Sequence, residues 1–223
     1  MLFLWIALYG LVNLVPETVS GNESLSEWLH AGLLTGYSIA FLCWIHGQKK
    51  RKEIGVQWPR MLPKEACFLL PLAVFPVYNL FLHQEISVSL AFVLQMLCVA
   101  LTEELFFRGF LLSSLRKYGC LPAVLLTSTV FALLHGLNFP QYPDSIYVWM
   151  QIGSGFCVSL YYSCFVMRFG SILPCVAAHF LTNITAAGRI DDWCAYAGVA
   201  GSMIICILFS RILIVSIKKE TVI

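Results

Sequence analysis

Long apolar runs separated by short polar stretches dominate this 223-residue chain. A membrane-spanning helix needs roughly 17–25 mostly apolar residues. Only 12% of the residues are charged, which is about half the share found in soluble domains. The eight apolar runs cover residues 1–15, 28–46, 66–82, 86–115, 121–137, 146–167, 171–187 and 193–217. The first and seventh are marginal in length, but together the runs predict an all-α, polytopic membrane protein of about eight helices, with residues 1–223 forming a single membrane domain.

Lys and Arg residues gather on one side of the predicted bundle. The loop at 47–65 carries six of them, and the basic residues near 116, 168 and 218 fall on the same side if the helices alternate in direction. The opposite side is acidic and has Arg189 as its only basic residue. Short loops rich in Lys and Arg remain in the cytoplasm, so we expect both termini to be cytoplasmic.

Three charged residues lie within the apolar run at 86–115. They are Glu103, Glu104 and Arg108. A charge at the centre of a bilayer costs at least roughly 2.5–3.5 kcal/mol, so such residues usually mark a functional site. Glu104 and Arg108 are four residues apart and share a helix face, where they can pair. Glu103 is rotated by about 100° from Glu104, and is left without a partner on its own helix.

Two further apolar runs carry polar residues at a similar depth. Phe131 and His135 lie four residues apart in one run, and His179 and Asn183 lie four residues apart in another. With a rise of about 1.5 Å per residue, Glu103, His135 and His179 lie roughly 20, 24 and 14 Å from the loops on the basic side. We therefore expect Glu103, His135, His179 and Asn183 to share one band of the membrane.

A carboxylate, two imidazoles and an amide are typical of a hydrolytic site. Glu103 in a partly dry cavity can take a proton from water, and histidine can orient that water. A second histidine and an asparagine amide can donate hydrogen bonds to the oxyanion of a tetrahedral intermediate. The same histidines and a glutamate could instead bind a catalytic Zn²⁺ through three ligands, so the residues alone leave a divalent metal open.

The three polar patterns together resemble a known family. Residues 103–108 read EELFFR, residues 131–135 read FALLH, and residues 179–183 read HFLTN. They match the E-E-x-x-x-R, F-x-x-x-H and H-x-x-x-N motifs of the CPBP intramembrane proteases, which include CAAX proteases and bacteriocin-processing enzymes. Each motif is weak alone, but the three occur in order on separate apolar runs. The resemblance covers residues 86–190, the expected catalytic core.

The resemblance implies an active site in a cavity within the bilayer. It assigns water activation to Glu103, assistance to His135, and oxyanion stabilisation to His179 with Asn183. Glu104, Arg108 and Phe131 would support the site. The family is often called a metalloprotease family, but this chain lacks H-E-x-x-H, the pattern that would favour zinc strongly. No metal is therefore assigned, although Zn²⁺ stays open.

The resemblance also bears on the partners of the protein. Type II CAAX endopeptidases remove the last three residues from prenylated C-termini, while other members of the family act on different substrates. We therefore expect a peptide or protein substrate, with prenylation left open, together with contacts to membrane lipids. Nothing in the sequence indicates a nucleic acid as a partner.

Three alternatives differ from this reading in mechanism. In a proton-coupled transporter, Glu103 and Glu104 would relay protons, but the sequence shows no internal repeat of the kind that many transporters contain. A catalytically inactive relative could act as a membrane scaffold or immunity protein. A rhomboid-type serine protease would use Ser154, although glycine and serine in a spanning helix more often serve packing. A proteolysis assay and a serine-directed phosphonate distinguish these alternatives.

Overall fold

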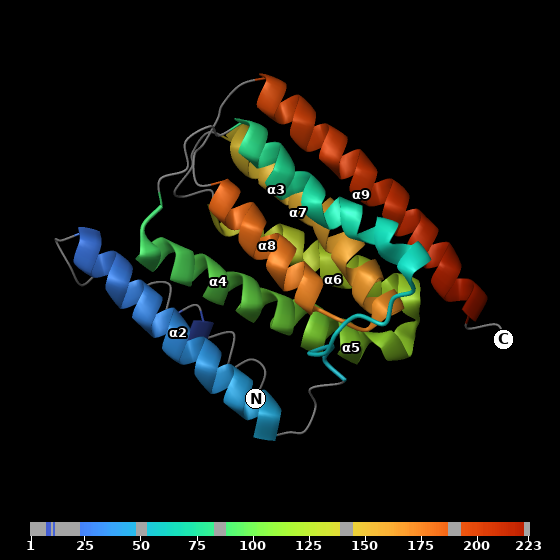
Figure 1. Ribbon diagram of the computed structural model, residues 1–223, viewed down its shortest axis with the longest axis horizontal. Coiled ribbons are helices and arrows are strands. Elements are labelled where there is room, and N and C mark those ends of the chain that lie inside the picture. Colours follow the sequence, from blue (N-terminus) through green and yellow to red (C-terminus); the bar gives the residue numbers. More distant parts are fainter. Residues whose placement is uncertain are drawn as a thin grey trace.

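A computed structural model describes residues 8–9, 11, 23–47, 53–82, 88–138, 145–186 and 193–220 (Figure 1). All the regular structure in these ranges is helical. The helices in chain order are α2 (Glu23–Gly47), η1 (Pro63–Leu69), α3 (Leu70–Leu82), α4 (Leu90–Glu104), η2 (Leu105–Leu111), α5 (Leu112–Leu115), η3 (Arg116–Tyr118), α6 (Cys120–Leu134), η4 (His135–Asn138), α7 (Ser145–Phe169), α8 (Leu173–Thr185) and α9 (Trp193–Glu220).

Within the described ranges, six helical segments are long and apolar enough to cross a membrane. They are Ser24–Gly47, Pro63–Leu82, Leu90–Tyr118, Cys120–Leu137, Ile146–Phe169 and Tyr196–Ile217. These six correspond to predicted runs two to six and eight. The seventh run forms α8, whose 13 residues are too few to span a bilayer unless the bilayer is locally thinned. The first run lies outside the described residues except at positions 8, 9 and 11. The prediction of an all-α polytopic membrane protein is confirmed.

The helices pack side by side in one bundle, with α2 along one edge and α9 along the opposite edge (Figure 1). Helix α4 lies between α2 and α8, while α7 packs against α6 and α9. Helix α3 completes the arrangement by contacting α8 and α9. The two helices that carry the Glu and His motifs, α4 and α8, are therefore direct neighbours although they are far apart in the sequence.

Polar contacts hold α2 in register along α4. The Ser38 and Thr102 hydroxyls lie 3.1 Å apart in the buried interface. Nearer the start of α4, the Gln95 amide donates to the Glu27 carbonyl at 2.8 Å, and the Ser89 hydroxyl donates to the Glu27 carboxylate at 2.9 Å. Hydrogen bonds between spanning helices are worth roughly 0.6–2 kcal/mol each. They fix α4, and with it Glu103 and Glu104, relative to α2.

The helix that carries the glutamates is not uniformly α-helical. Immediately after Glu104 it widens into a π-helix, η2, which continues to Leu111. Inside η2, Gly109 lies against Ile54, and a Cβ atom at position 109 would come within 3.2 Å of the Ile54 side chain. Short π-helical segments occur frequently at functional sites. Here the segment contains Arg108 and begins directly after the carboxylate that Arg108 binds.

The stretch at 53–62 packs over one end of the bundle through backbone contacts. The Gln57 side-chain amide donates to the Gly170 carbonyl at 2.8 Å, and the Ile172 backbone N–H donates to the Gly55 carbonyl at 3.0 Å. Gly55 and Gly170 have φ angles of 78° and 69°, which favour glycine. These bonds bind the stretch to the connection between α7 and α8.

Candidate active site

Glu104 and Arg108 form a fully buried ion pair. The Arg108 Nη1 donates to Glu104 Oε1 at 2.9 Å, and neither side chain is exposed. The guanidinium also lies over the ring of Phe131, 4.5 Å from its centroid, with the Tyr162 ring 5.5 Å away. A cation over an aromatic face is stabilised by roughly 0.5–2 kcal/mol. The predicted pairing of Glu104 with Arg108 is confirmed, and Phe131 joins it as an aromatic partner.

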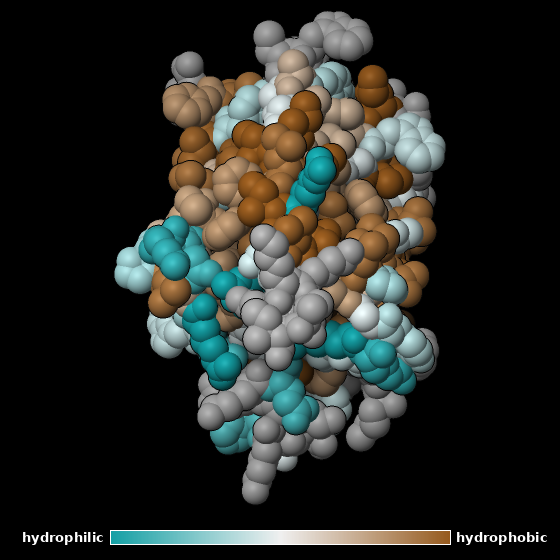
Figure 2. Space-filling model, turned by 90° about the vertical axis from the view of Figure 1, so that its right-hand side faces the viewer, coloured by the Kyte–Doolittle hydropathy of each residue, from teal (hydrophilic) through white to brown (hydrophobic). Residues whose placement is uncertain are grey.

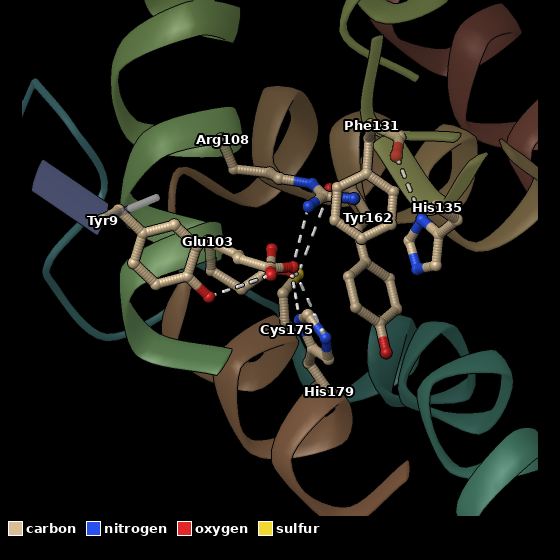
Figure 3. A network of polar contacts seen from close by, with 9 residues as sticks. Tyr9, Glu103, Arg108, Phe131, His135, Tyr162, Cys175 and His179 are labelled. Atoms are coloured by element: carbon tan, nitrogen blue, oxygen red, sulfur yellow. Dashed lines mark hydrogen bonds and ion pairs between the residues drawn. The ribbon is translucent and has the colours of Figure 1, made fainter. Parts of the chain in front are cut away.

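His179 of α8 lies close to both glutamates of α4, and Figure 3 shows its ring beside Glu103. Its Nδ1 is 2.9 Å from Glu104 Oε1, which is hydrogen-bonding distance. Its Nε2 is 3.9 Å from Glu103 Oε2. Since a carboxylate only accepts hydrogen bonds, Nδ1 carries a proton and donates it toward Glu104. Glu104 therefore orients the imidazole so that its other nitrogen faces Glu103.

Glu103 has a second neighbour that no sequence motif indicated. The Tyr9 hydroxyl donates to Glu103 Oε1 at 3.3 Å, and the Tyr9 ring packs against Tyr37 of α2. The Glu103 side chain is 25% exposed, in contrast to the fully buried Glu104. One carboxylate oxygen of Glu103 thus faces Tyr9 and the other faces His179. A tyrosine inside an apolar run carries no signal that could have predicted this contact.

A cavity of about 250 Å³ brings three of the four predicted catalytic residues together. His135, His179 and Asn183 all line it. Glu103 does not line this cavity, and it approaches the cavity through its contact with His179. The Asn183 amide makes no hydrogen bond to any described residue, so it is available to a ligand. The two histidines and the asparagine thus share one cavity, and Glu103 lies behind His179.

His135 contacts its own helix rather than Glu103. Its Nδ1 lies 3.1 Å from the Phe131 carbonyl oxygen, and its ring packs 5.1 Å from the Phe131 ring. No hydrogen bond or ion pair joins His135 to Glu103, both of which lie in the described part of the chain. The Phe131 ring also packs 6.1 Å from that of His179. Phe131 therefore contacts both histidines and Arg108.

The cavity wall includes polar residues that the motifs did not predict. Several of these side chains carry hydroxyl or amide groups: Asn79, Tyr147, Gln151, Ser154, Thr182 and Tyr196. Asn79 donates to Thr182 O at 3.4 Å, and Gln151 donates to the Tyr147 hydroxyl at 2.9 Å. Their spacing in the sequence matches no catalytic pattern, so only the packing of α3, α7, α8 and α9 identifies them. Together they make part of the cavity wall polar.

The donor set does not fit a resident metal. Within the described ranges, no three His, Cys, Asp or Glu side chains are grouped so that they could hold a metal ion. Around His179 the nearest donors are Glu103 and Glu104, but Glu104 is already held by Arg108. A three-ligand zinc site needs each of its donors about 2.0–2.3 Å from the ion. The residues that the fold brings together are arranged as a hydrogen-bond network.

Part of the chain matches a known family. Residues 85–185 match the family model of Type II CAAX prenyl endopeptidase Rce1-like proteins. This match, over a little less than half of the chain, supports the resemblance to the CPBP intramembrane proteases that the three motifs predicted. Together with the six apolar helices, it supports an integral membrane peptidase. Comparison with curated proteins and with solved structures gives no match.

Proposed function

We propose that this protein hydrolyses peptide bonds of membrane-associated substrates with a water molecule that Glu103 activates. The observation that carries the proposal is the position of His179. It is hydrogen-bonded to Glu104, faces Glu103 at 3.9 Å, and lines the same cavity as His135 and Asn183. An oriented imidazole and an amide on the cavity wall thereby lie beside the carboxylate of Glu103, which would act as the base.

The proposed first step is attack by water. A water about 2.8 Å from both Glu103 Oε2 and His179 Nε2 satisfies ordinary hydrogen-bond geometry. The water gives one proton to Glu103 while its oxygen bonds to the scissile carbonyl carbon. The carbonyl π electrons move onto oxygen and form the oxyanion of a tetrahedral intermediate. Glu103 then delivers its proton to the amine nitrogen as the C–N bond breaks, which leaves a carboxylic acid and an amine.

The oxyanion is stabilised by groups on the cavity wall. The Asn183 amide donates one hydrogen bond. His179 donates a second hydrogen bond from Nε2 when both of its nitrogens are protonated. The negative charges of the neighbouring Glu103 and Glu104 stabilise this positively charged form. Preorganised donors of this kind are worth roughly 2.7–4 kcal/mol each in the transition state. His135, which also lines the cavity, assists the reaction.

We propose C-terminal processing of the CAAX type as the specific activity, with a prenylated substrate as its first candidate. The family match supports the CAAX assignment. The cavity supports an apolar peptide segment, because Phe75, Leu82, Met150, Val158 and Val199 line it beside the polar residues. Membrane lipids would hold the prenyl group while the peptide enters the cavity. Residues 86–190 are the proposed catalytic core.

The experiment is peptide cleavage by the purified protein in proteoliposomes. Matched prenylated and unprenylated CAAX peptides are incubated in H₂¹⁸O, and the products are analysed by mass spectrometry. We expect the C-terminal tripeptide to be removed and the new carboxylate to contain ¹⁸O. Cleavage should be faster for the prenylated peptide than for the unprenylated one. A serine-directed phosphonate should not inhibit cleavage, and activity should be retained after stringent chelation. Absence of cleavage would favour a transporter or an inactive scaffold. Loss of activity on chelation that Zn²⁺ restores would contradict the metal-free mechanism.

A further inference from the structure

A second cavity, of about 300 Å³, lies at the end of the bundle away from the histidines. Four of the residues that line it are arginines, and each comes from a different segment of the chain. They are Arg60 in the stretch at 53–62, Arg108 in η2, Arg116 in η3 and Arg168 near the end of α7. Among the described residues on the wall, Glu53 is the single acidic one. So dense a group of like charges is a feature that peptide hydrolysis does not require.

Two of these arginines lack a carboxylate partner. Arg168 is bound to Glu65 at 2.7 Å. Within the described part of the chain, Arg60 and Arg116 form no ion pair. Arg116 is nevertheless held in place, because its Nε donates to the Met167 sulfur at 2.9 Å. The cavity therefore presents positive charge that the described residues leave without a counter-ion.

Arg108 connects this cavity with the candidate active site. It is only 1% exposed, and its Nε and Nη2 have no hydrogen-bond partner among the residues that the structure describes. Its Nη1 binds Glu104, which in turn orients His179. A buried guanidinium with two unused donors is costly, and an anion close by would lower that cost. Guanidinium groups bind phosphate oxygens particularly well, since their donors match the spacing of two oxygens.

The location suits an anion that lies at the membrane surface. On the right-hand face of the bundle, where α5 and the end of α9 lie, hydrophilic residues gather over the lower half and apolar residues over the upper half (Figure 2). The basic loops place this end in the cytoplasm under the proposed topology. The cytoplasmic leaflet contains anionic lipids, which attract such basic clusters. The cavity is thus positioned at the depth of lipid headgroups.

We propose that this arginine-lined cavity binds a phosphate group, either from the headgroup of an anionic phospholipid or as free phosphate. Arg60 and Arg116 contact the phosphate oxygens, and Arg168 and Arg108 add to the positive field. Because Arg108 also holds Glu104, occupancy of the cavity stabilises the arrangement of His179. This last effect rests on the proposed function, while the binding itself does not.

The test compares two double variants that remove the same charge. Arg60→Gln/Arg116→Gln alters the cavity wall, and both residues are exposed enough to be replaced without disturbing the core. Lys64→Gln/Lys117→Gln removes two exposed charges at the same end that do not line the cavity. Each full-length protein is delipidated in detergent. Binding is then measured separately for inorganic phosphate and for phosphatidylglycerol, with phosphatidylcholine as the neutral reference.

We expect the unaltered protein and the lysine double variant to bind phosphatidylglycerol with similar affinity, and the arginine double variant to bind it at least about tenfold more weakly. Binding of phosphate as well would identify the free ion as sufficient; binding of the lipid alone would identify the headgroup as the source. Equal losses in the two double variants, or no preference over phosphatidylcholine, would overturn the proposal. Since binding is measured without substrate, this result is independent of whether the protein cleaves peptides.

A second measurement tests the coupling through Arg108. Peptide cleavage that is faster in phosphatidylglycerol vesicles, with the acceleration lost only in the arginine double variant, would support the coupling. Equal cleavage rates in both lipids would overturn the coupling alone.

Discussion

Replacing Glu104 separates its two tasks, which are neutralising Arg108 and orienting His179. Glu104→Gln retains an amide oxygen that can accept from His179 Nδ1 but removes the charge that pairs with Arg108. Breaking a fully buried ion pair by neutralising one member costs roughly 3–5 kcal/mol. For a chain of this size that cost corresponds to a fall in Tm of roughly 6–20 °C. Arg108 Nη1 and Glu104 Oε1 are 2.9 Å apart, and neither side chain is exposed. Water therefore cannot solvate the Arg108 charge once Glu104 is neutralised.

A double replacement provides the matched control. In Glu104→Leu/Arg108→Met both charges are removed, and replacing a buried pair by apolar residues is often neutral or stabilising by roughly 1–4 kcal/mol. The double variant should therefore recover most of the lost stability. It should remain inactive, because His179 Nδ1 has lost its acceptor at 2.9 Å. Thermal unfolding in detergent and peptide cleavage measure the two effects separately. An unchanged Tm for Glu104→Gln, or full activity in the double variant, would refute this account of Glu104.

Four further outcomes follow from the same geometry. Asn183→Ala should lower the catalytic rate about 10²–10³-fold with little change in KM, since it removes an oxyanion donor; an equal rise in KM would point to substrate binding instead. Phe131→Leu should lower Tm more than Phe131→Tyr, because only the first removes the ring that lies 4.5 Å from the Arg108 guanidinium. Tyr9→Phe removes only the hydroxyl that donates a hydrogen bond to Glu103, so kcat should change while the Tm stays close to that of the unaltered protein. A large loss of stability would make Tyr9 a packing residue. A single cysteine at Lys50 in a cysteine-free background should be labelled from the cytoplasmic side, and labelling from outside would reverse the proposed topology.

The local features of the site could be predicted from the sequence. Helical periodicity places Glu104 and Arg108 on one face, and that pairing exists at 2.9 Å. The apolar runs predict the spanning helices because a bilayer imposes a minimum apolar length. The order of the three motifs gives the resemblance to the CPBP proteases, which the family match at 85–185 supports.

The contacts between helices could not be predicted in the same way. The bond from His179 to Glu104 joins residues 75 positions apart, and periodicity says nothing about which helices become neighbours. The π-helix after Glu104 leaves no trace in an apolar pattern, since widening by one residue per turn preserves the composition. Tyr9 and the arginine-lined cavity depend on segments outside the motifs. The sequence therefore predicts which residues are costly in a membrane, while tertiary packing decides which of them meet.

The most direct test of the central claim is the rate of peptide cleavage by Glu103→Gln under single-turnover conditions. Glutamine keeps the shape of the side chain and can still accept from Tyr9, but it cannot take a proton from water. The account predicts that the chemical step slows by about 10²-fold or more, while Tm and substrate binding remain close to those of the unaltered protein. A folded Glu103→Gln protein that cleaves at the full rate would contradict the assignment of Glu103 as the base.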